Sequence, residues 1–152
     1  MAREIETFIE GYRKSLGEGD IESVVAAYRL PLPVIRPDRT VMVTEARVLH
    51  AEITKIIDTY RWAGMRTIAI GGLRIDGFDP GMHMVSLTWR PLNEIGEEVA
   101  AVDVTYAVRR TMGGARIAAV VAHNEERRRD PLISAWYHQL TSQVAEARRG
   151  KT

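Results

Sequence analysis

VAAVDVTYAVRR, TMGGA and RIAAVVAHNE run consecutively from Val99 to Glu125, and this stretch decides the fold. Both long halves are rich in Val, Ile, Ala, Thr and Tyr, which favour β-strands. Gly113 and Gly114 between them supply the positive-φ positions that a hairpin turn needs. Strands of this length usually lie in the centre of a sheet rather than at its edge. The sequence therefore predicts a long, buried hairpin that the preceding elements cover.

Helices come first and the longer strands come last in the remaining chain. Apolar residues at helical spacing predict helices over about residues 3–16 and 45–63, with a short helix between them that begins after Asp20. Asp20 and Thr44 are the expected N-caps of the second and third helices. Two short strands flank residues 36–38, and longer strands cover about 66–75 and 82–90. Paired glycines at residues 71–72 predict a bulge that bends the first of these longer strands.

This order predicts an α+β domain in which a strongly bent antiparallel sheet wraps around three N-terminal helices. A bent sheet around a helix leaves a conical hollow, so we expect a cone-shaped α+β barrel. After the hairpin, apolar spacing predicts one further helix over residues 131–148. We interpret residues 1–126 as the body of the domain and residues 127–152 as a C-terminal helical extension that forms a lid or an interface.

Composition excludes several classes of function. The chain has 152 residues, no cysteine, and a formal net charge of +1 from 21 basic and 20 acidic residues. Disulfides, thiolate catalysis and cysteine-based metal sites are therefore excluded, and the balanced charge favours neither nucleic acid nor an acidic membrane as a partner. The four histidines lack metal-ligand spacing, so we expect no metal and no cofactor. We find no signal peptide or membrane span, and we expect a cytoplasmic protein.

The predicted order and three tyrosines resemble the nuclear transport factor 2-like superfamily, in its SnoaL-like and ketosteroid isomerase-like branch. The resemblance covers about residues 5–125, and its most specific parts are YRKSLGEGDIESVVAAY (12–28) and IIDTYRWAGM (56–65). In the isomerases, a tyrosine of the first helix donates its hydroxyl to the substrate oxygen, and two further tyrosines support it. Tyr12, Tyr28 and Tyr60 stand at the matching positions.

The resemblance also implies where this chain departs from the isomerases. Arg36 stands where the isomerases carry the aspartate that serves as general base, and Asp38 is the nearest carboxylate. Tyr106 matches the protonated aspartate that donates to the same oxygen. The oxygen-binding half of the site is therefore implied by Tyr12 and Tyr106. Asp38 is a candidate base, although a turn-forming role is commoner for an aspartate that follows a proline.

Strand alternation assigns faces to the hairpin. Val102, Val104, Tyr106 and Val108 share one face, which should line the hollow, and the alternate residues, among them Asp103, face outward. We expect a second copy of the chain to dock on this outer face, giving a homodimer.

Further residues complete the candidate site. His83 and Trp89 share the parity of inward residues on their strand, where the tryptophan either stacks on a flat ligand or fills the core. Only one of His123 and Asn124 can face the hollow, because adjacent strand residues point to opposite sides. The hairpin turn can close in two registers, so both remain candidates.

Two functions follow from these residues. The first is a small-molecule-binding protein, whose apolar pocket holds an oxygen-bearing apolar ligand against the tyrosines. The second is a cofactor-independent isomerase, cyclase or dehydratase, in which Tyr12 and Tyr106 polarise a carbonyl and Asp38, His83 or His123 moves the proton. Buried tyrosines that only satisfy one another would give the same pattern.

Overall fold

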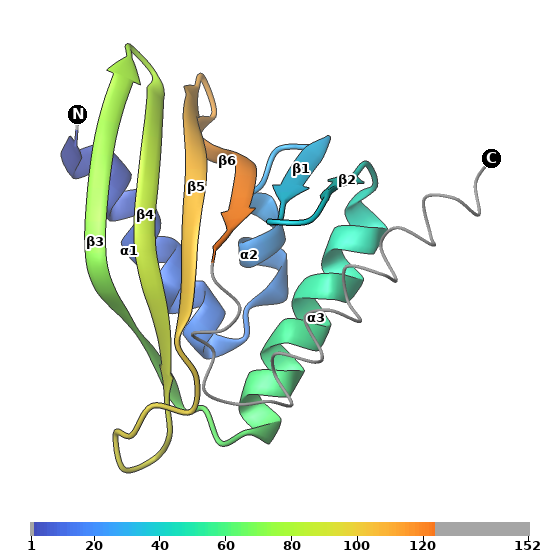
Figure 1. Ribbon diagram of the computed structural model, residues 1–152, viewed down its shortest axis with the longest axis vertical. Coiled ribbons are helices and arrows are strands. Elements are labelled where there is room, and N and C mark those ends of the chain that lie inside the picture. The colour runs from blue at the N-terminus through green and yellow to red at the C-terminus, as the bar shows by residue number, and fades with distance from the viewer. Residues whose placement is uncertain (1, 124–152) are drawn as a thin grey trace.

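The computed structural model describes residues 2–123, which form three helices and six strands (Figure 1). The helices are α1 (Ala2–Glu18), α2 (Ile21–Ala26) and α3 (Ala46–Trp62). The strands are β1 (Leu32–Ile35), β2 (Thr40–Val43), β3 (Thr67–Asp79), β4 (Met82–Leu92), β5 (Val102–Thr111) and β6 (Gly114–Ala122). The expected C-terminal helix over residues 131–148 and the extension over 127–152 lie outside the described residues.

All six strands belong to one curled sheet in the order β2-β1-β6-β5-β4-β3. The predicted α+β architecture is confirmed, and the hairpin β5–β6 lies inside the sheet, as expected. The sheet is not closed, since β2 and β3 form its two edges (Figure 1).

The expectation of a purely antiparallel sheet is wrong at one junction. Strand β1 runs parallel to β6, with Val34 opposite Val120 and Ile35 opposite Val121. A short turn can join only antiparallel neighbours, whereas β1 and β6 are separated by most of the chain, so no turn dictates their direction.

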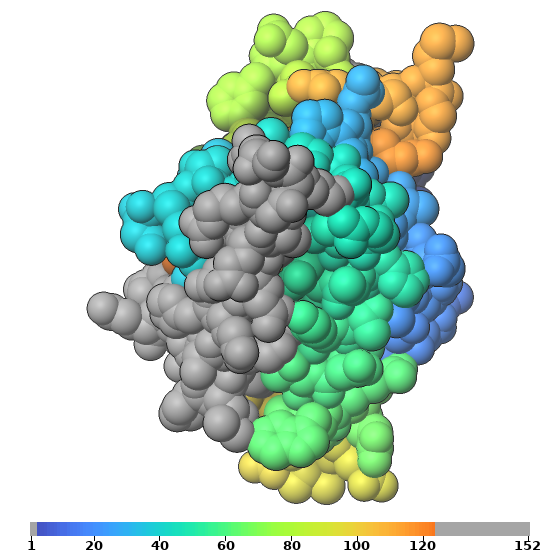
Figure 2. Space-filling view, turned by 90° about the vertical axis from the view of Figure 1, so that its right-hand side faces the viewer, coloured from blue at the N-terminus to red at the C-terminus, as the bar shows by residue number. Residues whose placement is uncertain are grey.

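The core lies between the helices and the concave face of the sheet. Residues with at most 1% of their surface exposed come from all three helices and from β4, β5 and β6. Among them are Ile5, Ile9, Val24, Ile57, Val85, Val108 and Ile117. Helix α3 forms much of one side of the molecule, with the β1–β2 unit beside it (Figure 2). The candidate site is a cavity lined by residues of α3 and of the sheet.

Local sequence signals are confirmed in part. Asp20 caps α2 by accepting a hydrogen bond from the Ser23 amide. Thr44 does not cap α3, because the helix begins one residue later than its hydroxyl would require, with Glu45 at the N-cap position and no side-chain capping bond. The register of β3 against β4 shifts between Gly71 and Arg74, which confirms the predicted bulge.

The turn of the β5–β6 hairpin needs only one of its two glycines in a positive-φ conformation. Thr111 pairs with Gly114, which leaves a two-residue loop, and Gly114 has φ +103°. Gly113 has no positive φ, contrary to the expectation for the pair.

A second bulge lies further along the hairpin and changes the faces of β6. Val108 pairs with Ile117 and Ala107 pairs with Ala119, so Ala118 is an extra residue on β6. Before it, Ile117 faces the core; beyond it, Val120 takes the inward position opposite Tyr106. A one-residue insertion exchanges the two faces of the strand that follows.

Candidate functional site

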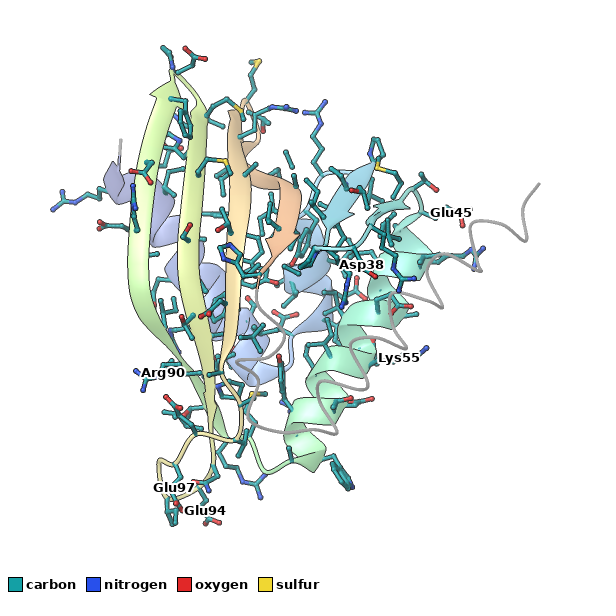
Figure 3. The ribbon with its side chains drawn as sticks, in the orientation of Figure 1. Asp38, Glu45, Lys55, Arg90, Glu94 and Glu97 are labelled. Atoms are coloured by element: carbon teal, nitrogen blue, oxygen red, sulfur yellow. The ribbon has the colours of Figure 1, made fainter. Side chains whose placement is uncertain are left out.

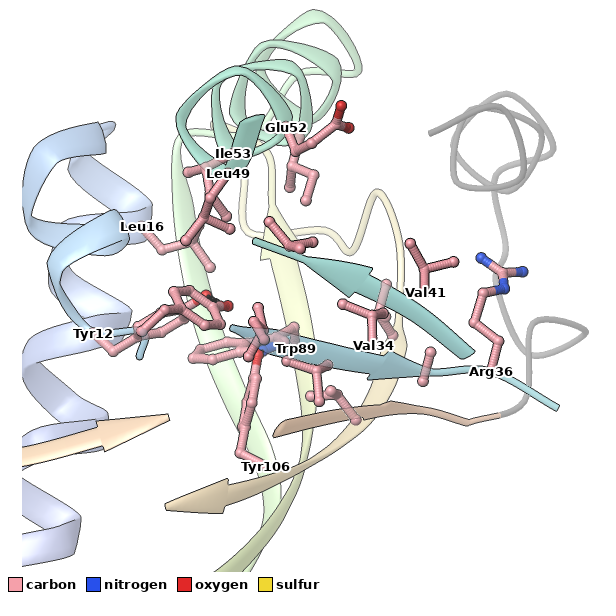
Figure 4. Close-up of a pocket in the computed structure, with 18 of the residues that line it drawn as sticks. Tyr12, Leu16, Val34, Arg36, Val41, Leu49, Glu52, Ile53, Trp89 and Tyr106 are labelled. Atoms are coloured by element: carbon pink, nitrogen blue, oxygen red, sulfur yellow. Dashed lines mark hydrogen bonds between the residues drawn. The ribbon is translucent and has the colours of Figure 1, made fainter. Parts of the chain in front are cut away.

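A cavity of about 150 Å³ lies between α3, α1 and the inner face of β1, β2, β4, β5 and β6 (Figure 4). Its wall is largely aliphatic, with side chains that include Leu16, Val34, Val41, Leu49, Ile53 and Val104. An apolar cavity of this size can hold a molecule as large as benzene. The cavity is therefore suited to a small ring.

Four aromatic residues form a hydrogen-bonded set at one end of this cavity, and we call Tyr12, Tyr28, Trp89 and Tyr106 the aromatic group. The indole Nε1–H of Trp89 donates to the Tyr106 hydroxyl at 2.8 Å, and the hydroxyls of Tyr12 and Tyr28 lie 2.6 Å apart. The Tyr12 ring stands 5.6 Å from the Trp89 ring and 6.0 Å from the Tyr106 ring, centre to centre. Tyr12 therefore lies in the middle of the group.

Burial raises the pKa of Tyr12 well above its usual value of 10.0. The nearby Tyr106 and Tyr28 hydroxyls raise the same pKa further, because an anion at Tyr12 would be close to both of them. Tyr12 consequently keeps its proton at neutral pH. A neutral hydroxyl in an apolar site can donate a hydrogen bond to a ligand oxygen and accept one from a neighbour.

The structure brings together all four tyrosines that the sequence analysis singled out. Tyr12, Tyr28 and Tyr60 all line the cavity, and so does Tyr106 from β5. Trp89 also lines it, so the inward parity predicted for that residue is confirmed. The hydrogen bond from Trp89 to Tyr106 was not foreseen, because Trp89 pairs with Val102 and the two aromatic side chains reach each other diagonally across the sheet.

The predicted proton-transfer residues lie elsewhere. Asp38 sits in the turn between β1 and β2 with 69% of its side chain exposed, and its Oδ1 lies 3.8 Å from Nε of Arg36 (Figure 3). His83 is buried on the inner face of β4, as its parity predicted, but it packs beside Gly77, six residues along the strand from Trp89. Neither Asp38 nor His83 is among the described residues that line the cavity.

His123 lies on the outer face of the sheet. It is exposed, and its Nε2 lies 2.5 Å from the hydroxyl of Thr105, an outward residue of β5. The bulge at Ala118 explains this placement, because it makes Ala122 the inward residue at the end of β6. Asn124 falls outside the described residues.

The sequence did not predict that two charged side chains would line the cavity together. Glu52 of α3 and Arg36 both line the cavity and are only 8% and 7% exposed. Figure 4 shows both on the side of the cavity away from Tyr12. A signal for Glu52 was present in the sequence, since it falls on the apolar stripe of α3 between Leu49 and Ile53.

Burial raises the pKa of Glu52 above its usual 4.5, against the opposing attraction of Lys55 on the next turn of α3. Lys55 itself points outward from the helix (Figure 3). The site thus combines an apolar wall, a neutral aromatic group at one end and charged residues at the other.

A family model described as an NTF2-like protein (DUF6841) matches residues 3–125. The chain belongs to this family. The match covers nearly the whole described body of the domain, so the resemblance inferred from the tyrosines is confirmed at the level of the superfamily. A search of curated proteins gave no match.

Solved structures with the same fold are distant in sequence. Aln2 from a Streptomyces species has a TM-score of 0.64 at 14% identity, over 82% of this chain and 90% of that one. An NTF2-like protein of unknown function from Pseudomonas putida has a TM-score of 0.61 at 14% identity, over 78% and 82%. A ketosteroid isomerase-like protein from Erwinia carotovora atroseptica has a TM-score of 0.55 at 16% identity, over 84% and 95%. At these identities the likeness establishes the fold alone.

Among the described residues, no helix is long and apolar enough to cross a membrane. In the same part of the chain, no three His, Asp or Glu side chains are grouped closely enough to hold a metal ion.

Proposed function

We propose that this protein binds a small, apolar, oxygen-bearing molecule in the cavity, with the ligand oxygen held by Tyr12 and Tyr106. The observation that carries the proposal is the placement of hydrogen-bonding hydroxyls at one end of a largely aliphatic wall. Sites for small molecules typically combine a mostly apolar lining with a few polar groups that fix orientation. The cavity volume of about 150 Å³ favours a single-ring ligand.

The proposal is tested by comparing two ligands of nearly the same shape, 4-ethylphenol and 4-ethyltoluene, which differ by a hydroxyl in place of a methyl group. Calorimetric titration of the wild-type protein should show tighter binding of the phenol. In Tyr12→Phe, the advantage of the phenol should shrink by about 1 kcal/mol, the typical net contribution of one neutral hydrogen bond. Affinity for 4-ethyltoluene should stay the same, and this ligand is therefore the control for changes in cavity shape.

A wild-type protein that binds both ligands equally well, or neither of them, contradicts the proposal. So does a Tyr12→Phe variant that keeps the full preference for the phenol. Tyr106→Phe removes the acceptor of the buried Trp89 indole N–H, whereas Tyr12→Phe removes the partner of the Tyr28 hydroxyl, and Tyr28 is only partly buried. Tyr12→Phe is therefore the less disruptive of the two substitutions.

The second candidate function is a cofactor-independent isomerase, cyclase or dehydratase. The raised pKa of Tyr12 supports it, because a neutral hydroxyl in a buried site can stabilise negative charge developing on a carbonyl oxygen. Catalysed exchange of the α-hydrogens of cyclohexanone in D₂O, followed by NMR, would detect such polarisation, and Tyr12→Phe should slow it. Exchange at the buffer rate would leave binding as the proposed function.

We also propose that two copies associate through the outer face of the sheet. On this face Thr88 donates to the Asp103 carboxylate, and the hydroxyls of Ser86 and Thr105 lie 2.8 Å apart, so these four side chains are hydrogen-bonded within a single copy. Sedimentation at micromolar concentration should give a dimer, and Ser86→Arg should dissociate it. A monomeric wild-type protein would refute this proposal.

A further inference from the structure

Among the acidic residues that the structure describes, Glu52 is the one that is buried. It is 8% exposed, it lines the cavity, and its Oε2 is buried without a hydrogen-bond partner among the described residues. Buried carboxylate oxygens are almost always hydrogen-bonded, because removing them from water is costly. An oxygen left in this condition at a cavity wall is explained most simply by a partner that arrives with a ligand.

The neighbours of Glu52 do not supply that partner. Lys55 is the cationic side chain that acts on its carboxylate, but it lies one helical turn away and points outward (Figure 3). The flanking stripe residues Leu49 and Ile53 are aliphatic, and so are Val41 and Val34 across the cavity. Arg36 also lines the cavity, but Figure 4 shows its guanidinium group apart from the Glu52 carboxylate, and its Nε lies 3.8 Å from Oδ1 of Asp38. Among the described residues, no donor therefore reaches Oε2 of Glu52.

Glu52 and the aromatic group are at different ends of the same cavity (Figure 4). The aromatic group can donate to a ligand oxygen, whereas an ionised carboxylate only accepts. A molecule that satisfied both ends would carry an oxygen at one end and a hydrogen-bond donor at the other. The aliphatic residues between the two ends would contact its ring.

We propose that the ligand of this cavity is a small ring with an oxygen that the aromatic group holds and, opposite it, a hydrogen-bond-donating substituent that Glu52 holds. A hydroxyl and an ammonium group share this chemistry, and the experiment separates them. The inference rests on the proposed binding function and adds to it the polarity of the ligand's second end.

The test uses three phenols that differ only in the terminal atom of the opposite substituent: 4-ethylphenol, 4-(hydroxymethyl)phenol and 4-(aminomethyl)phenol. Calorimetric titration gives the affinity of each for the wild-type protein and for Glu52→Leu, in which an aliphatic side chain of similar volume replaces the carboxylate. Asp58→Ala is the control, because it removes an exposed negative charge from the same helix. Circular dichroism spectra establish that each variant is folded.

The affinity of a donor-bearing phenol relative to 4-ethylphenol should fall about tenfold or more in Glu52→Leu, as expected for the loss of a hydrogen bond to a charged group. The Asp58→Ala protein should keep the wild-type ratio. If the amine shows the loss and the alcohol does not, the donor is an ammonium group; the reverse result identifies a hydroxyl.

Unchanged ratios in Glu52→Leu would overturn the inference, and so would wild-type binding of 4-ethylphenol that is as tight as the binding of both donor-bearing phenols. Both outcomes leave the proposed function intact as long as 4-ethylphenol binds better than 4-ethyltoluene. Failure of that last comparison is a failure of the function itself. Should Glu52→Leu not fold, Glu52→Gln serves in its place, with the expected loss confined to the amine because an amide oxygen still accepts from a hydroxyl.

Discussion

Replacing Tyr106 by phenylalanine tests whether the aromatic group is held together by its hydrogen bonds. Tyr106 and Trp89 are 4% and 5% exposed, so the indole N–H left behind in Tyr106→Phe cannot turn to water. An orphaned buried donor costs about 1–3 kcal/mol, and Tyr12 loses one neighbouring hydroxyl while keeping the one of Tyr28 at 2.6 Å. We therefore expect the free energy of unfolding to fall by about 2–3 kcal/mol.

Urea unfolding followed by circular dichroism measures this loss, and the dependence of the free energy on urea should keep its slope, because the folded state stays equally compact. The loss is a large part of the total stability of a domain of this size, about 5–15 kcal/mol. It should therefore appear as a clear shift of the unfolding midpoint.

A double-mutant cycle with Trp89→Phe separates the orphaned donor from simple loss of packing. In the double variant no indole N–H remains to be satisfied, so its loss of stability should be smaller than the sum of the two single losses by about 1–2 kcal/mol. The same cycle with Asp20→Ala, an exposed substitution at the N-cap of α2, should be additive. Additivity within about 0.5 kcal/mol for the Trp89 pair would refute the reasoning, since the hydrogen bond would then contribute nothing beyond the two side chains' packing.

Three further predictions concern the hairpin turn, a helix cap and pH. Gly114→Ala should lower the free energy of unfolding by about 1–2 kcal/mol, because Gly114 has φ +103°. Gly113→Ala should cost less, because Gly113 has an ordinary φ and an added Cβ would lie 3.8 Å from its nearest neighbours. Thermal unfolding compares the two variants. Asp20→Ala should cost about 1 kcal/mol through loss of the α2 cap, and Thr44→Ala, at a residue that caps nothing, should leave the midpoint of urea unfolding in place. The pKa of Glu52 is raised on folding, so the folded state binds the proton of this carboxyl more tightly than the unfolded state does. The free energy of unfolding should therefore fall as the pH rises from 4.5 through the raised pKa. Urea titrations at a series of pH values measure this effect, and Glu52→Gln should remove it.

The elements of this fold could be predicted because each has a local cause. Helical spacing marked α1 and α3, the glycine pair marked the bulge in β3, and the carboxylate of Asp20 marked the start of α2. The parallel junction between β1 and β6 could not be predicted in this way. It joins segments that are far apart in the sequence, and no turn between them records their direction.

The residues of the candidate site that the family resemblance implied could be predicted from the sequence, and the prediction of the remaining site residues was incomplete. Tyr12, Tyr28 and Tyr60 line one cavity, as the family's pattern implied, but the resemblance pointed to Asp38 for the missing base. That residue is exposed in a turn, and the buried carboxylate of the cavity is instead Glu52, on a different element. The position of Glu52 on the apolar stripe of α3 was visible in the sequence. An acidic residue at such a position, however, is usually taken to lie at the edge of the apolar stripe, where the exposed face of the helix begins.

The bulge at Ala118 shows why the end of the hairpin could not be assigned from alternation alone. A regular β6 that keeps Ile117 inward would also turn residues 119, 121 and 123 inward, and His123 would reach the cavity. The extra residue reverses that parity, so Val120 and Ala122 complete the aliphatic wall and His123 pairs with Thr105 outside. Nothing in the run of small residues around Ala118 marks which of them is unpaired, because Ala and Val fit either face of a buried sheet. The apolar character of this part of the cavity thus depends on one backbone insertion, and not on the residue types alone.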